Sequence, residues 1–205
     1  MDVETTIFVV DDDEAIRKAL TTAGKLIGRP VRSFASADEF LAGYDPAVPG
    51  CLVLDIKMPG MTGVELQRKL IADGTAIPVI VVSGHADVRI AVEVMSRGAV
   101  TLLEKPFRLD ELLAHIRTAI ETDAVNRAKI AERAETESRL AALTPKELEV
   151  LDLIVSGKTN KDIAAVLGLS LRAVEDRRAR LMKKAEARSI ADLIRLRDSL
   201  AEGDI

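Results

Sequence analysis

The chain has 205 residues, a length that fits one large domain or two small ones. Apolar residues make up 48% and charged residues 30% of the chain, which excludes a disordered protein and predicts a soluble globular one. The single cysteine, Cys51, excludes an internal disulfide and a cysteine-based zinc site, and it favours a reducing compartment.

The chain begins with MDVETTIFVV, which carries acidic residues where a signal peptide needs basic ones. No apolar run approaches the roughly 18 residues of a membrane span. We therefore expect a cytoplasmic protein with no membrane partner.

Residues 1–122 alternate short β-branched runs with amphipathic helical stretches, which is typical of an α/β fold. The predicted strands are Ile7–Val10, Val31–Phe34, Cys51–Leu54, Val79–Val82 and Val100–Leu103. The predicted helices between them are Glu14–Ile27, Ala37–Leu41, Gly63–Ala72 and Asp87–Ser96. Several strands are apolar throughout, as in a sheet covered on both faces, so we expect five parallel strands in a doubly wound sheet.

A further helix should begin near Leu109, and no proline or glycine interrupts the sequence from there until Pro145. The first part of this helix has an apolar stripe, but beyond Asp123 large apolar residues are rare. We predict a long helix whose second part, residues 123–142, is either a solvated linker or a weak coiled-coil seam.

From residue 143 onward the pattern is all helical. Four helices are expected, over residues 145–156, 161–167, 171–185 and 190–200, with N-caps at Thr144, at Thr159 or Asn160, and at Ser170. The second and third of these helices are joined by a tight turn at Gly168-Leu169, which indicates a helix-turn-helix. The chain therefore divides into an α/β domain (1–122), a helical linker (123–142) and an all-α domain (143–205).

Polar side chains follow four of the five predicted strands. They are Asp11-Asp12-Asp13, Asp55, Ser83 and Glu104-Lys105. Because ligands bind at the carboxyl ends of strands in an open α/β sheet, these side chains should form one site. Crowded carboxylates need a cation, and hard oxygen ligands suit Mg²⁺. A lysine and a hydroxyl nearby could stabilise an added phosphoryl group, with one central aspartate as its acceptor.

Basic residues concentrate in the all-α domain, although the net charge of the chain is -4. Residues 1–122 hold 13 Lys+Arg and 18 Asp+Glu, whereas Ser170–Lys184 holds six basic and two acidic residues. A focused basic stripe on an otherwise acidic chain predicts a polyanionic partner.

Two sets of motifs resemble known families. The motifs VVDDDE, LVLDIKMPGMTG, VIVVSGHAD and LLEKPF make residues 1–122 similar to the flavodoxin-like receiver domain of two-component response regulators. The run LTPKELEVLDLIVSGKTNKDIAAVLGLSLRAVEDRRARL resembles the LuxR-type helix-turn-helix of the NarL/FixJ family. The resemblance implies a phosphorylation-controlled, DNA-binding transcriptional regulator and not an enzyme.

In the first domain, the resemblance implies that Asp55 accepts a phosphoryl group from a sensor histidine kinase. Asp11 and Asp12 would hold Mg²⁺ together with Asp55 and the backbone carbonyl of Lys57. We choose these two of the three consecutive acids because Val10 ends the predicted strand, which leaves Asp13 to favour the next helix N-terminus.

The resemblance also assigns the other residues of this site. Ser83 would hydrogen-bond the phosphoryl group, and Lys105 would pair with it, with the Lys105-Pro106 bond in the cis form. Lys57 and His85 hold the positions that tune the lifetime of the aspartyl phosphate. Leu102 stands where relatives often have Tyr or Phe, so an aromatic rotamer readout is excluded here.

In the all-α domain, the resemblance implies that the helix capped by Ser170 enters the major groove of DNA. The implied contacts are Lys161, Arg172, Glu175, Asp176, Arg177, Arg178, Arg180 and Lys184. The acids Glu175 and Asp176 either accept hydrogen bonds from cytosine or point away from the DNA. The implied partners are promoter DNA, the histidine kinase, RNA polymerase and, after phosphorylation, a second copy of the chain.

Two other functions stay open. A Mg²⁺-dependent phosphohydrolase of the dehalogenase type would also form an aspartyl phosphate, but it needs a second acid two residues after the nucleophile, where this chain has Lys57. A constitutive DNA-binding protein, whose acidic pocket only stabilises the fold, would bind its operator independently of phosphorylation.

Overall fold

The computed structural model describes residues 4–84 and 87–201, the last three by their backbone alone. The chain divides into two compact units, Met1–Arg127 and Ala128–Ile205. Within the described part of the chain, no helix is long and apolar enough to cross a membrane.

The first unit is built on a parallel sheet, as predicted. Its strands are β1 (Thr6–Val10), β2 (Val31–Phe34), β3 (Gly50–Asp55), β4 (Val79–Ser83) and β5 (Thr101–Glu104). Their order is β2-β1-β3-β4-β5, the flavodoxin-like order of a doubly wound sheet. The register pairs Val10 with Leu54 and Asp55 with Val82, so the carboxyl ends of the three central strands meet at one edge.

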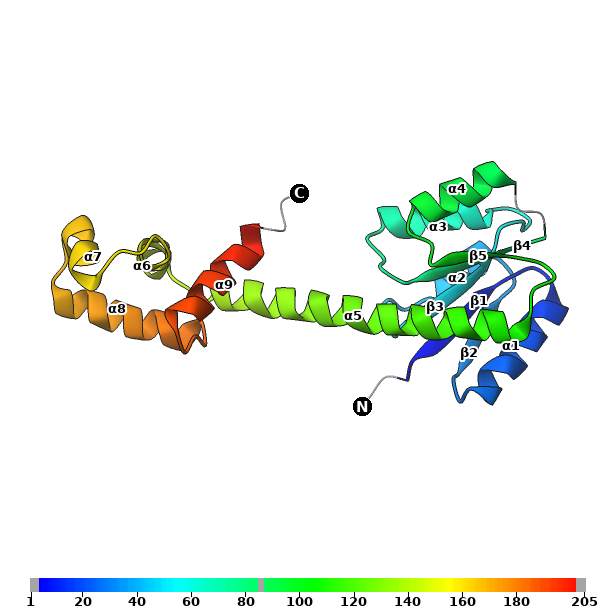
Figure 1. Ribbon diagram of the computed structural model, residues 1–205, viewed down its shortest axis with the longest axis horizontal. Coiled ribbons are helices and arrows are strands. Elements are labelled where there is room, and N and C mark those ends of the chain that lie inside the picture. The colour runs from blue at the N-terminus through cyan, green and yellow to red at the C-terminus, as the bar shows by residue number, and fades with distance from the viewer. Residues whose placement is uncertain (1–3, 85–86, 202–205) are drawn as a thin grey trace. The chain divides into compact units, whose positions relative to one another are not determined.

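Helices cover both faces of this sheet (Figure 1). They are α1 (Glu14–Leu26), α2 (Ala37–Gly43), α3 (Gly63–Ala72), α4 (Val88–Ser96) and the first part of α5 (Leu109–Ala141). Alternate strand residues point to opposite faces: Phe8 and Leu52 pack with residues of α2, α3 and α4, whereas Val9 and Val53 pack with residues of α1 and α5. This two-sided burial explains why the three central strands, β1, β3 and β4, are buried along their whole length and mostly apolar.

Short polar side chains fix where these helices begin. Asp13 accepts hydrogen bonds from the backbone N–H groups of Ala15 and Ile16 and so caps α1. Thr62 and Glu65 form a reciprocal capping box at the start of α3. The helix that we predicted from Asp87 begins one residue later, because the Asp87 side chain is its N-cap.

The long helix is confirmed: α5 is a single element of 33 residues. Leu112, Ile116 and Ala119 in its first part are buried against the sheet. Val125 and Ile130, further along, are 54% and 57% exposed, which is compatible with both the solvated linker and the coiled-coil seam that we predicted as alternatives.

The second unit contains the four predicted helices. They are α6 (Pro145–Val155), α7 (Asn160–Leu167), α8 (Leu171–Lys184) and α9 (Ile190–Ala201). Their core is formed by buried residues such as Leu151, Ile163, Val174, Leu181 and Leu193. Thr159 rather than Asn160 caps α7, and Gly168 ends it with a φ of 63°, a left-handed conformation that favours glycine.

Candidate metal centre and nucleic-acid interface

Three carboxylates meet at the carboxyl edge of the sheet. Asp11 follows β1, Asp55 ends β3, and the exposed Asp12 adjoins them. One ligand oxygen from each lies within 4.8 Å of the other two. Asp11 and Asp55 are only 1% and 4% exposed, so two negative charges are buried side by side and require a compensating cation. The donor set of hard oxygen atoms suits a divalent cation such as Mg²⁺.

Lys105 compensates both buried carboxylates in this structure. Its Nζ donates hydrogen bonds to Asp11 Oδ2 at 2.7 Å and to Asp55 Oδ1 at 2.8 Å. Burial alone would lower the pKa of Lys105, but its hydrogen bonds and charge attraction to Asp11 and Asp55 outweigh burial and raise it. Lys105 is therefore a firmly charged group inside the pocket.

The pKa of Asp55 is raised above its ordinary value. Burial is the main cause; the charges of Asp11 and Asp12 add to it, while the hydrogen bond and charge of Lys105 oppose it. An anion that its surroundings disfavour gains from any cation that enters the pocket. The electrostatics thus favour recruitment of positive charge beside Asp55.

The three consecutive acids have different positions. Asp11 Oδ1 accepts the backbone N–H of Asp13 at 2.9 Å, and the carbonyl of Asp11 accepts Arg17 Nη1 at 2.6 Å. Asp13 caps α1, so its carboxylate is occupied by backbone donors, whereas Asp12 is exposed beside the pocket. The structure thus brings Asp11 and Asp12, together with Asp55, close to one another, and their role as cation ligands stays a prediction.

Two other predicted residues lie at or just after the carboxyl ends of β4 and β3. Ser83 is fully buried at the end of β4, and Lys57 is exposed in the segment after β3. The Lys105-Pro106 bond is cis, as predicted. His85 lies outside the described residues. Gly63, the first residue of α3, packs against the backbone of Asp55: a Cβ at this position would lie only 2.1 Å from the carbonyl oxygen of Asp55.

In the second unit, α7, the Gly168 turn and α8 form the predicted helix-turn-helix. Ser170 caps α8 through the N–H of Ala173, and the buried Val174 and Leu181 hold α8 on the core. The opposite face of α8 and the start of α7 carry exposed polar side chains. The exposed predicted contacts are Lys161, Arg172, Glu175, Asp176 and Arg180; Arg177, Arg178 and Lys184 are half-buried.

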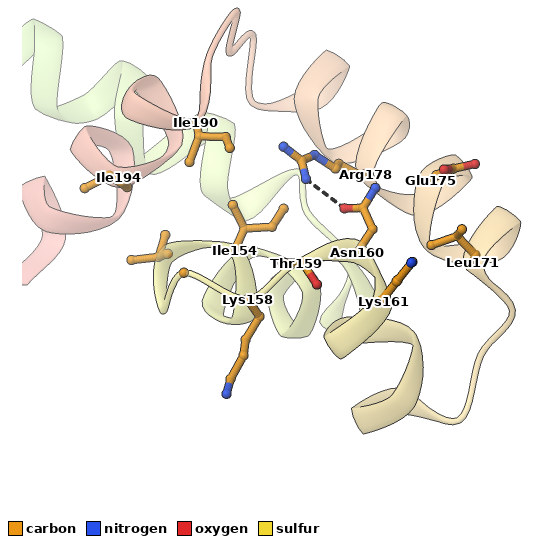
Figure 2. A pocket seen from close by; sticks show the side chains of 12 residues that line it. Ile154, Lys158, Thr159, Asn160, Lys161, Leu171, Glu175, Arg178, Ile190 and Ile194 are labelled. Carbon is orange, nitrogen blue, oxygen red and sulfur yellow. Dashed lines mark hydrogen bonds between the residues drawn. The ribbon is translucent and has the colours of Figure 1, made fainter.

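Arg178 has a hydrogen-bond partner within its own domain that we did not predict. Its Nη1 donates a hydrogen bond to Asn160 Oδ1 at 2.8 Å, which ties α8 to the first residue of α7. Figure 2 shows this bond beside a groove that is also lined by Lys161, Leu171 and Glu175. We considered Asn160 only as a cap, because the sequence contains no signal for a partner 18 residues away.

Lys184 is also engaged inside its own unit. Its Nζ donates to Glu147 Oε2 at 2.7 Å, and Glu147 is only 4% exposed in the capping box at the start of α6. The hydrogen bond from Lys184 and those from Thr144 lower the pKa of Glu147 to about 2. This pair joins the start of α6 to the end of α8, a connection that the sequence did not indicate.

A parallel sheet with an acidic pocket, followed by a helix-turn-helix with an exposed basic face, defines a receiver domain joined to a DNA-binding domain. Residues 7–117 match the family model of the response regulator receiver domain, and residues 141–197 match that of bacterial regulatory proteins of the luxR family. The chain belongs to the response regulators that carry a luxR-type DNA-binding domain.

Similar proteins support this assignment over the length of the chain. The chain is 41% identical over 194 residues to Nodulation protein W of Bradyrhizobium diazoefficiens, covering 95% of this chain and 86% of that protein. It is 40% identical over 190 residues to the transcriptional regulatory protein FixJ of Azorhizobium caulinodans, covering 93% and 90%. The structure of the response regulator StyR is similar with a TM-score of 0.90 and 37% identity, covering 95% of this chain and 98% of that one.

These findings confirm the predicted family and fold class. The family is one of DNA-binding transcriptional regulators rather than classical enzymes, and it implies DNA and a sensor kinase as partners.

Proposed function

We propose that Asp55 is the phosphoacceptor of this response regulator and that a sensor histidine kinase supplies the phosphoryl group. One observation carries the proposal: the buried Asp55 carboxylate, at the end of the central strand β3, is hydrogen-bonded to the Lys105 ammonium and lies beside the carboxylates of Asp11 and Asp12. This arrangement supports the proposal, because carboxylates suit a divalent cation and an ammonium group stabilises the charge of a phosphoryl group.

The transfer is a simple displacement. A carboxylate oxygen of Asp55 attacks the phosphorus, a P–O bond forms, and the P–N bond to the kinase histidine breaks with its electron pair going to the nitrogen. Lys105 donates hydrogen bonds to both Asp11 and Asp55. After the transfer, its ammonium can keep the hydrogen bond to Asp11 and exchange the one to Asp55 for a hydrogen bond to a phosphoryl oxygen. Ser83, at the end of the neighbouring strand β4, is the hydroxyl donor to a second phosphoryl oxygen.

The carboxylate geometry fits a Mg²⁺ ion. Asp11, Asp12 and Asp55 would hold it, with the backbone carbonyl of Lys57 as a fourth ligand. When bound, Mg²⁺ neutralises the charge of the phosphoryl oxygens. Lys57 and His85 remain our candidates for tuning the lifetime of the phosphorylated state.

The second part of the proposal is that α8 reads operator DNA. The exposed side chains of Lys161, Arg172 and Arg180 are suited to phosphate contacts, and Glu175 and Asp176 lie on the exposed face of α8. Arg177 and Arg178 complete the basic face. Lys184 is paired with Glu147 and would have to leave this pair to reach DNA.

We retain the functional division into residues 1–122, 123–142 and 143–205, a cytoplasmic location and the absence of enzymatic activity as parts of this proposal. Phosphorylation would favour a homodimer that binds paired half-sites and contacts RNA polymerase. The family membership and the two-site organisation of the chain support this view.

Intact mass measurement tests the phosphoacceptor directly. Wild type and Asp55→Asn are incubated with Mg²⁺ and acetyl phosphate, and Asp12→Asn serves as a variant that keeps the acceptor but loses one candidate ligand. We expect one phosphoryl adduct on wild type, none on Asp55→Asn and slower uptake by Asp12→Asn. An adduct that persists in Asp55→Asn would place the acceptor elsewhere.

A further inference from the structure

A buried carboxylate lies at the opposite end of β3 from Asp55. Asp123, in the part of α5 that we assigned to the linker, is 3% exposed. Its Oδ2 accepts the backbone N–H of Gly50 at 2.8 Å and Arg127 Nε at 2.8 Å. Gly50 is the first residue of β3, so α5 is bonded directly to the strand that carries Asp55.

Arg127 extends this connection to the segment before β3. Its Nη2 donates to the carbonyls of Pro46 and Val48, both at 2.9 Å, and its Nη1 donates to the carbonyl of Ala47 at 3.3 Å. One guanidinium thus holds three consecutive carbonyls while its Nε pairs with Asp123. We call Asp123, Arg127 and the segment 46–50 that they hold the linker clamp.

The linker clamp lies at the point along α5 where the first compact unit ends. The first compact unit ends at Arg127, and the helix continues without a break beyond it. The next ion pairs along the helix, Arg133–Glu137 and Glu135–Arg139, each join residues four positions apart in α5, and Arg139 also pairs with Glu186 of the second unit. The clamp is therefore placed where the helix leaves the receiver unit.

Such a clamp differs physically from a surface ion pair. Its carboxylate is buried and hydrogen-bonded to a backbone N–H, so removal of Arg127 leaves a buried charge with fewer partners and three carbonyls without this donor. The last turn of α5 on the receiver would then be held to β3 and to the segment before it by fewer bonds. If α5 is held less firmly to the receiver, a conformational difference between the unphosphorylated and phosphorylated receiver has less effect on the rest of the helix.

We propose that the linker clamp is a coupling device, in which Asp123 and Arg127 act as positioning residues that transmit the phosphorylation state of the receiver through α5 to the DNA-binding domain. This inference rests on the proposed function, because it assumes that phosphorylation of Asp55 controls DNA binding. The clamp does not contact the acidic pocket, so phosphoryl uptake is independent of it.

The test compares wild type, Arg127→Ala and Asp123→Asn with Arg133→Ala as the matched control. Arg133 is an arginine of the same helix whose partner, Glu137, lies within that helix. For each full-length protein, the affinity for a fixed DNA fragment from the upstream region of its gene is measured with and without acetyl phosphate. Intact mass follows phosphoryl uptake, and hydrogen exchange follows the amides of residues 118–127.

We expect all four proteins to take up one phosphoryl group. Phosphorylation should change the DNA affinity of wild type and of Arg133→Ala by the same factor. In Arg127→Ala and Asp123→Asn, phosphorylation should change the DNA affinity by less than twofold. Exchange of residues 118–127 should be faster in the two clamp variants. If Arg127→Ala does not fold, Arg127→Lys replaces it, because a lysine can still pair with Asp123 but cannot hold three carbonyls.

The outcomes separate the two proposals. A wild type that responds to phosphorylation, together with clamp variants that respond equally, would overturn the coupling role and leave a purely structural contact. A wild type that takes up a phosphoryl group without any change in DNA affinity would overturn the coupling role of the clamp together with the proposed control of DNA binding by phosphorylation, while uptake itself would still be assigned by the Asp55→Asn variant.

Discussion

At the scale of single residues, the positive charge of Lys105 compensates the two buried carboxylates of the receiver pocket, those of Asp11 and Asp55. It holds two buried carboxylates at 2.7 and 2.8 Å, yet Asp55 remains an anion whose pKa is raised by burial and by its acidic neighbours. The ionised form of Asp55 therefore costs stability in the folded state. The same cost favours a cation or a phosphoryl group when either becomes available, because each brings new partners into the pocket.

This cost predicts a stabilising substitution. Asp55→Asn should melt at a higher temperature than wild type at pH 7 without divalent cations, because the amide removes a disfavoured charge but can still accept a hydrogen bond from Lys105. The pKa of Asp55 is raised in the folded state, so the difference in melting temperature between Asp55→Asn and wild type should be largest at pH values above that pKa. It should shrink as the pH falls through the raised pKa and vanish below the ordinary pKa of 3.8.

Thermal unfolding of both proteins across this pH range is the measurement, with Asp73→Asn as an exposed acidic control. Equal melting temperatures of wild type and Asp55→Asn at pH 7 would contradict the electrostatic description of the pocket.

At the scale of elements, α8 carries two kinds of basic residue. Arg180 is exposed, whereas Lys184 is bonded to the buried Glu147 and braces α6 against α8. A count of basic residues on the helix treats the two alike. The structure separates them, because a cation that already neutralises a buried carboxylate releases fewer counterions when DNA binds.

The salt dependence of DNA binding tests this separation. Arg180→Ala should weaken binding to all sequences and reduce the slope of log K against log salt by about 1, as expected when one phosphate contact is lost. Lys184→Ala should leave the slope of wild type nearly unchanged, although it destabilises the domain by roughly 1–3 kcal/mol. A slope lowered equally by both substitutions would show that Lys184 leaves Glu147 to bind DNA.

The sequence predicted the bounds of the helices and strands better than it predicted any other feature of the structure. The strands were predicted to within about one residue because most of the apolar runs start after a proline or glycine or end at a polar residue, as where Val10 is followed by Asp11. Helix starts in the second unit followed from short capping side chains such as Thr144 and Ser170. Local signals of this kind need no knowledge of tertiary packing.

Contacts between distant residues could not be predicted in the same way. The bonds of Arg178 to Asn160, of Lys184 to Glu147 and of Asp123 to Gly50 join residues 18, 37 and 73 positions apart. Each depends on how two elements pack, which no spacing rule provides. The acidic pocket was the exception, because parallel topology alone brings the carboxyl ends of β1, β3 and β4 together.

At the scale of the whole molecule, one chain contains a pocket suited to phosphoryl transfer and a helix-turn-helix suited to DNA. A single helix, α5, runs from the first unit into the second. A regulator of this kind requires a coupling free energy between its two sites, which in proteins is typically worth about 5- to 150-fold in affinity.

The measurement that tests this account most directly is the affinity of wild type and Asp55→Asn for the same upstream DNA fragment, with Mg²⁺, in the presence and absence of acetyl phosphate. The account predicts that acetyl phosphate tightens binding by wild type by roughly 5- to 150-fold and leaves Asp55→Asn unchanged. Equal affinity of both proteins under both conditions would contradict it and would indicate a constitutive DNA-binding protein.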